Sequence, residues 1–145
     1  MPHEIGSIPL TMPLGLGSVN CYLVKTGQGC ILIDTGSSNR RADLEKELIR
    51  ADCMPGALDM ILLTHGDFDH TGNAAYLAKK FDAQIALHAG DRGMAERGDM
   101  FAGRTSGNWL VKLIAPLSAL LFGFGRVERF TPDIAIDEGT DLAQY

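Results

Sequence analysis

The pattern of apolar positions in the first part of the chain is typical of β-strands. Residues 17–24 and 30–34 are two runs rich in β-forming side chains, and a glycine-containing turn at residues 26–29 separates them. Two such runs joined by a short turn predict a β-hairpin.

Helical spacing begins after this hairpin. The apolar residues among 40–51 recur at helical intervals and leave a charged outer face. Ser38 and Asn39 come just before this segment, and both are of a type that caps a helix. We therefore expect a helix over residues 40–51, with Ser38 or Asn39 as its side-chain cap.

A strand, a helix and a second strand follow in order. Residues 60–64 form a continuously apolar run, which is typical of a strand buried on both faces. Residues 74–81 favour a helix that ends in two lysines, and residues 83–88 favour another short strand. This order predicts a βαβ unit within an α/β fold, a mixed sheet flanked by helices. The length of 145 residues fits a single domain, residues 1–145.

Two segments after this unit are less regular. Residues 90–107 are glycine-rich and charged, and predict a loop with a helical turn. Residues 105–128 hold a long apolar stretch, which a lysine and a proline interrupt and which falls short of the ~20 apolar residues of a membrane span. We favour a helix packed on the core. The alternatives are an apolar insert or lid over the active site, with Trp109, Phe122 and Phe124 in the substrate pocket, and membrane contact without stable insertion.

Composition narrows the classes of function. Apolar residues make up 46% of the chain and charged residues 21%, as in ordinary globular proteins. A chain of this length buries a core without a structural metal, so a metal site is free to serve chemistry. The net charge is −5, and apart from Arg40-Arg41 the basic residues are scattered and form no clustered basic face. Nucleic acid is therefore not an expected partner.

The cysteines and the N-terminus indicate the compartment. The chain has three cysteines and no Cys-x-x-Cys pair, so neither a disulfide framework nor a thiolate zinc site is expected. Cys21 and Cys30 lie in apolar runs and should be buried. The first residues lack a basic segment followed by an apolar core, so we expect a cytoplasmic protein without a signal peptide.

The densest group of chemically active side chains lies between the predicted strand at 60–64 and the helix at 74–81. Within six residues, and with no lysine or arginine among them, stand His65, Asp67, Asp69 and His70. In an extended loop the first three would project to one side and His70 elsewhere, so that one loop would feed two metal positions. Imidazole with carboxylate suits Zn²⁺, and Fe or Mn where carboxylates are numerous. Close carboxylates repel each other unless a cation lies between them. The pattern predicts a metal site rather than a solvated acidic turn.

This loop resembles the signature of the metallo-β-lactamase fold superfamily of metal-dependent hydrolases. The family has His-x-His-x-Asp-His where this chain has His65-x-Asp67-x-Asp69-His70. Residues 34–36, Asp-Thr-Gly, are similar to the turn that ends the family's opening hairpin. Residues 71–73, Thr-Gly-Asn, are similar to the start of the helix after the metal loop, and residues 133–139 to a later hairpin.

The resemblance implies one or two zinc ions. His65 and Asp67 would bind the first, and Asp69 and His70 the second. Asp67 stands where the family has a second histidine, and a carboxylate there adds a negative charge and a harder ligand. We expect this change to shift the preference toward Fe or Mn and to make a bound water less acidic.

The resemblance also implies a hydrolase that uses a metal-activated water on a small molecule such as an ester, lactone or thioester. Asp69 is the expected catalytic residue, which orients the water and accepts its proton. Asp34 and Thr64 are expected to fix the histidine tautomers without binding the metal themselves.

The family fold is an αββα sandwich of two similar halves, and this chain resembles the first half plus an insert. It lacks the family's later Gly-His, aspartate and histidine ligands. Three interpretations stay open: a truncated fragment, a homodimer that imitates the missing half, or the N-terminal portion of a longer enzyme. Two other functions stay open as well, an iron-dependent sulfur oxygenase on the same fold and a catalytically inactive fragment that self-associates.

Overall fold

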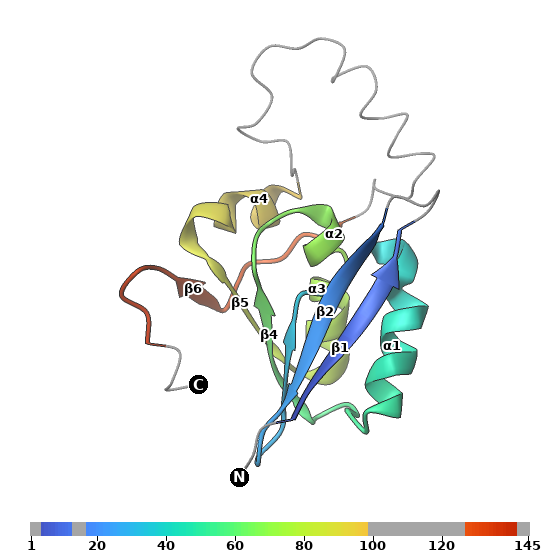
Figure 1. Cartoon of the computed structure of the whole chain (residues 1–145). Coiled ribbons are helices and arrows are strands. Elements are labelled where there is room, and N and C mark those ends of the chain that lie inside the picture. The colour runs from blue at the N-terminus through green and yellow to red at the C-terminus, as the bar shows by residue number, and fades with distance from the viewer. Residues whose placement is uncertain (1–3, 13–16, 99–126, 142–145) are drawn as a thin grey trace.

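The strands of the protein form one mixed sheet (Figure 1). The computed structural model describes residues 4–12, 17–98 and 127–141. Within these residues the sheet has six strands, which lie side by side in the order of the sequence. The strands are β1 (Glu4–Thr11), β2 (Ser18–Lys25), β3 (Cys30–Ile33), β4 (Leu58–Leu63), β5 (Gln84–His88) and β6 (Ile134–Ile136). The first three pair antiparallel, and β3 to β6 pair parallel.

Helices connect the parallel strands. The helical elements are η2 (Ser38–Arg40), α1 (Arg41–Arg50), α2 (Phe68–Thr71), α3 (Ala74–Phe81), η3 (Ala89–Asp91) and α4 (Arg92–Arg97). The helix α1 joins β3 to β4, and α3 joins β4 to β5. Both connections have the same hand in folds of this kind, so both helices pack on the same face of the sheet.

The main core lies between that face and the two helices. Leu44 and Leu48 of α1 and Leu77 of α3 are fully buried against strand residues such as Leu32 and Ile61. Alternate residues of β2 are buried, as expected of a strand that turns one face to a core.

The opposite face of the sheet carries a smaller apolar cluster. Its buried members are Met60, Ala86 and Ile134. Three partly buried residues surround them, Ile31, Leu62 and Ile136. The sheet therefore has apolar side chains on both faces, as the continuous run at residues 60–64 predicted.

The hairpin, the helix over 40–51 and the βαβ unit are confirmed, with boundaries that differ by one or two residues. The expected α/β fold, a mixed sheet flanked by helices, is confirmed as well. Cys21 and Cys30 are buried, as predicted, and so is Cys53. The edge strand β1 was not foreseen.

The predicted side-chain cap of α1 is wrong. Ser38 and Asn39 lie in the short helix η2, and α1 begins after Arg40 without a side-chain cap. The Asn39 side chain instead accepts a hydrogen bond from the Ser37 hydroxyl at 2.7 Å. A turn of 3₁₀ helix leads into α1 and replaces the cap.

Residues 133–139, which resemble a later hairpin of the family, contain one strand among the described residues. This strand, β6, pairs parallel with β5 through a register that sets Leu87 beside Ala135. Parallel neighbours need a connection of about a dozen residues or more, and the long segment between β5 and β6 supplies it. Residues 105–126 of the expected insert or lid lie outside the described residues. No helix among the described residues is long and apolar enough to cross a membrane.

Truncation of a buried leucine of α1 should destabilise the protein. Leu48 is fully buried and its neighbour Ile49 is 56% exposed, so the two residues form a matched pair on one helix. We expect Leu48→Ala to lower the free energy of unfolding by about 2–5 kcal/mol and Ile49→Ala by about 0.5 kcal/mol. Urea unfolding followed by circular dichroism measures both. Equal losses would show that α1 does not pack on the sheet as described.

Candidate metal centre at the carboxyl end of the sheet

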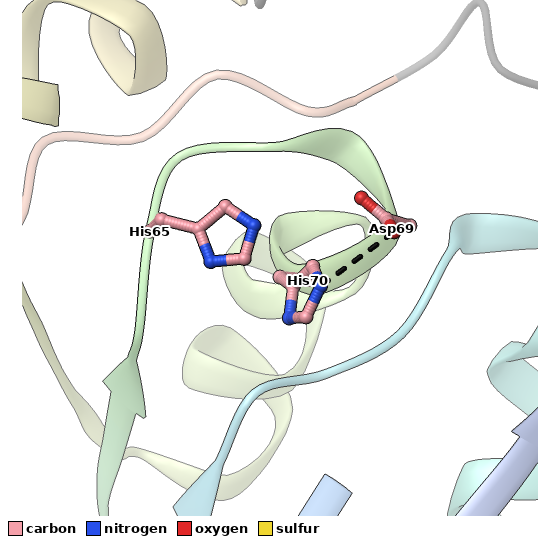
Figure 2. A group of neighbouring side chains, drawn as sticks. All are labelled: His65, Asp69 and His70. Atoms are coloured by element: carbon pink, nitrogen blue, oxygen red, sulfur yellow. Dashed lines mark ion pairs between the residues drawn. The ribbon is translucent and has the colours of Figure 1, made fainter. Parts of the chain in front are cut away.

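Three of the predicted ligand residues, His65, Asp69 and His70, lie where β4 ends, beside the end of the parallel strand β3 (Figure 2). His65 follows β4 on the connecting loop, and Asp69 and His70 lie on the short helix α2. In α/β folds the carboxyl ends of parallel strands are the usual place for a site, because the loops that leave them converge there.

The loop is not extended over its whole length, as the predicted directions of its side chains assumed. Asp67 has extended backbone angles, but the chain turns into α2 at Phe68. Asp67 then accepts backbone hydrogen bonds from His70 at 3.0 Å and Thr71 at 2.9 Å through its carbonyl oxygen. This turn brings His70 back toward His65, with ring centroids 4.0 Å apart.

Donor atoms of the loop converge to metal-binding spacing. His65, Asp69 and His70 each offer a ligand atom, and these atoms lie within 4.8 Å of one another. The side chains are partly open to solvent, from 20% to 37% exposed. An ion therefore has a route to the site.

Two imidazole–carboxylate pairs stand at the spacing of ligands on one ion. His70 Nε2 lies 3.5 Å from Asp69 Oδ2, and His65 Nε2 lies 3.4 Å from Asp67 Oδ2. Two ligands of a tetrahedral zinc ion with bonds of ~2.1 Å lie ~3.4 Å apart. The residues present therefore fit a metal ion, and the pairs are those that the resemblance assigned to two metal positions.

The Asp34 carboxylate contacts His70 directly and is linked to His65 through Thr64. It is 4% exposed and accepts hydrogen bonds from the Thr64 backbone N–H at 2.9 Å and from the Thr64 hydroxyl at 2.8 Å. It also lies 2.8 Å from His70 Nδ1, which therefore carries a proton and donates it.

The tautomer of His65 follows from the same network. The single hydroxyl proton of Thr64 goes to Asp34, so the Thr64 oxygen acts as acceptor toward His65 Nδ1, 2.9 Å away. With Nδ1–H as the donor on both rings, Nε2 of His65 and of His70 is left for a metal. Asp34 and Thr64 thus have the contacts that fixing the tautomers requires.

The same contacts shift two pKa values. Burial raises the pKa of the Asp34 carboxyl, but hydrogen bonds from His70 and Thr64 outweigh it and lower that pKa below its usual value. The hydrogen bond to Asp34 raises the pKa of His70 above its usual value, against the opposing effect of burial. Asp34 is therefore held in its ionised form, which suits a partner that accepts the Nδ1 proton of His70.

A second buried network holds the backbone of the loop. Thr35, fully buried, donates to the His70 carbonyl oxygen from its hydroxyl and from its backbone N–H, both at 2.8 Å. The Asn73 side chain donates to the carbonyl oxygens of Thr35 at 2.8 Å and Ser37 at 3.0 Å. Sequence reasoning did not foresee these roles, although both residues lie in the two short runs that resemble the family.

The expected pocket residues Trp109, Phe122 and Phe124 lie outside the described residues, so their role stays a prediction. The metal-binding roles of His65, Asp67, Asp69 and His70 also stay predictions, and the distances between their side chains are compatible with these roles.

The profile of the metallo-β-lactamase superfamily matches residues 14–143. The chain belongs to this superfamily. Among its relatives, a probable metallo-hydrolase of Bacillus subtilis, YybB, is 37% identical over 81 residues, which are 56% of this chain and 33% of that protein. A metal-dependent hydrolase of Myxococcus xanthus is 44% identical over 65 residues, 44% of this chain and 21% of that protein. The chain thus matches about a third or less of each relative.

Solved structures show the same fold. The subclass B3 metallo-β-lactamase BJP-1 of Bradyrhizobium japonicum superposes with a TM-score of 0.65 at 24% identity, over 86% of this chain and 42% of that one. A mutant of the metallo-β-lactamase FEZ-1 of Legionella gormanii superposes with a TM-score of 0.68 at 13% identity, over 97% and 48%. The chain therefore has the fold of somewhat less than half of these enzymes.

Substitution of Asp34 should weaken metal binding. Asp34 has a φ of 60°, a region that asparagine tolerates, so Asp34→Asn removes the charge without straining the backbone. We expect the zinc dissociation constant to rise ~10–100-fold, the usual effect of losing a partner that orients a ligand. The control is Asp43→Asn, an exposed carboxylate of α1. Competition with a chromophoric chelator measures both, and equal affinities would refute the role of Asp34.

A side chain at Gly72 should displace the metal loop. The three atoms nearest to a Cβ built there belong to the backbone: Ser38 N at 2.6 Å, Gly36 O at 2.7 Å and Phe68 O at 2.8 Å. We expect Gly72→Ala to lower the free energy of unfolding by about 1–3 kcal/mol, as overpacking does. Gly6→Ala is the control, because its nearest contact is 4.0 Å away. Thermal unfolding that ranked Gly6→Ala as the more damaging change would contradict the packing.

Proposed function

We propose that this chain supplies the metal-binding part of a metal-dependent hydrolase that acts on a small molecule. One observation carries the proposal. Two imidazole–carboxylate pairs stand at single-ion spacing. Nδ1 of His70 bonds to Asp34 and Nδ1 of His65 bonds to Thr64, which leaves Nε2 of each imidazole available. The relatives from B. subtilis and M. xanthus, which are described as metallo-hydrolases, support hydrolysis as the reaction.

Zinc, as one or two ions, is the metal we propose. A solved structure of the same fold, the class B3 enzyme LRA-12 from an Alaskan soil metagenome, is described as di-zinc. A bound zinc ion supplies a water of near-neutral pKa and polarises the bond to be cleaved. Iron or manganese is the alternative that Asp67 favours, because carboxylate is a harder ligand than imidazole.

The chain's own residues divide the remaining work. His65, Asp67 and His70 hold the metal, with Asp34 and Thr64 keeping the Nδ1 protons in place. Asp69 is the proposed catalytic residue, since its carboxylate lies beside His70 Nε2 and is partly open to solvent. It orients the attacking water and accepts its proton.

The substrate class we propose is an ester, lactone, thioester or related small molecule. The apolar segment at 105–128, with Trp109, Phe122 and Phe124, would favour a substrate with a hydrophobic group. A reducing, cytoplasmic compartment agrees with three cysteines that are all free and buried.

A second copy of the chain, or the remainder of a longer one, is the proposed partner. A zinc site usually takes four ligands, and the loop brings three residues to one point. The apolar cluster around Met60, Ala86 and Ile134 leaves its rim partly exposed, so it offers a surface for association. In a homodimer two metal loops would face each other across a two-fold axis.

A second candidate function rests on the composition of the cluster. His65, Asp69 and His70 are two histidines and one carboxylate, the ligand set of many non-haem Fe(II) oxygenases. An iron-dependent sulfur oxygenase would bind iron in preference to zinc and would consume oxygen with a persulfide substrate.

The purified chain distinguishes these functions. We expect bound zinc by elemental analysis, and hydrolysis of generic ester or lactone substrates that Asp69→Asn lowers by about 10²–10⁴-fold. Asp52→Asn is the matched control, because Asp52 is an exposed carboxylate whose φ of 57° suits asparagine.

Three other results would overturn parts of the proposal. Bound iron with oxygen consumption would favour the oxygenase. Neither metal nor turnover would favour the inactive fragment. A monomeric mass by light scattering would exclude the homodimer.

A further inference from the structure

Asp91 contacts the metal loop from an element that the sequence did not mark as functional. It ends η3 and occupies the residue before α4. A carboxylate in that position usually caps its own helix, but Asp91 makes no such bond. Its Oδ2 instead accepts a hydrogen bond of 2.9 Å from the backbone N–H of Gly66.

Gly66 is the residue between His65 and Asp67, and it is buried. A Cβ built on Gly66 would lie 3.2 Å from the Asp91 Cβ and 3.3 Å from the Met94 methyl group. The start of α4 therefore packs directly on the loop backbone. A residue larger than glycine at position 66 would be crowded by Asp91 and Met94.

The loop is tied on both sides of this contact. Upstream, the Thr64 backbone and side chain bond to Asp34. Downstream, the Asp67 carbonyl oxygen accepts from His70 and Thr71. The bond to Asp91 holds the peptide between these two ties, and rotation of that peptide would change the relative directions of the flanking side chains.

We propose that Asp91 is a positioning residue of the metal centre. Its carboxylate fixes the Gly66 peptide so that His65 Nε2 and Asp67 Oδ2 stay at their 3.4 Å spacing, ready for one ion. Asp34 orients the imidazole rings, whereas Asp91 orients the backbone that carries the first pair. Partners of this kind, which do not touch the metal, commonly tune its affinity. This inference rests on the proposed metal site.

The test uses Zn²⁺ and Co²⁺ as probes of the full chain. Asp91→Ala removes the acceptor, and we expect the zinc dissociation constant to rise ~10–100-fold and the visible spectrum of the Co²⁺ form to change. Asp91→Asn keeps a side-chain oxygen that accepts from Gly66, so it should retain most of the affinity. Glu96→Ala is the matched control, because Glu96 is an exposed carboxylate of α4 that pairs with Arg92.

A second readout needs no metal. The Gly66 amide should exchange with solvent faster in metal-free Asp91→Ala than in the wild type or in Glu96→Ala. If Asp91→Ala does not fold, Asp91→Asn and the slow exchange of the Gly66 amide in the wild type decide the question.

The outcomes separate this inference from the proposed function. Wild-type zinc affinity and wild-type Gly66 exchange in Asp91→Ala would overturn the positioning role alone. Equal losses in Asp91→Asn and Asp91→Ala would also overturn it, because the hydrogen bond would not be the cause. A wild-type chain that binds no zinc would overturn the metal site, and the positioning role with it.

Discussion

The buried carboxylate of Asp34 is the constraint on which the site depends. A charge that is 4% exposed is unfavourable unless hydrogen bonds and opposite charge compensate it. Here the compensation comes from Thr64 and His70, which belong to the loop after β4. The requirement to satisfy one anion at the end of β3 thus dictates where the next strand's loop must go.

The rest of the polar network follows the same logic. Among the described residues, every buried side-chain nitrogen or oxygen has a hydrogen-bond partner. Thr35 and Asn73 are buried and hydrogen-bond to each other, and Thr35 also donates to the His70 carbonyl oxygen. A network this complete favours a single arrangement of the loop, which a preorganised metal site requires.

The sequence predicted most of the sheet because its strands and helices have regular apolar periods. The helix α2 was missed, since four residues give no detectable period and α2 depends on the contact between Thr35 and the His70 carbonyl. The site residues were found because they cluster within six positions. Asp91 stands 25 residues from Gly66 in sequence, so no local pattern could reveal their contact.

The buried cysteines have a consequence for which ions the chain can capture. Burial raises the pKa of the Cys21 and Cys53 thiols to about 12, so at neutral pH they stay protonated and shielded. Thiolates are the ligands that copper(I), cadmium and mercury prefer. Because both of these sulfur atoms are buried in the core, an ion that reaches the loop contacts nitrogen and oxygen donors. Burial of these two thiols therefore keeps two potential thiolate ligands out of reach of an ion that binds at the loop.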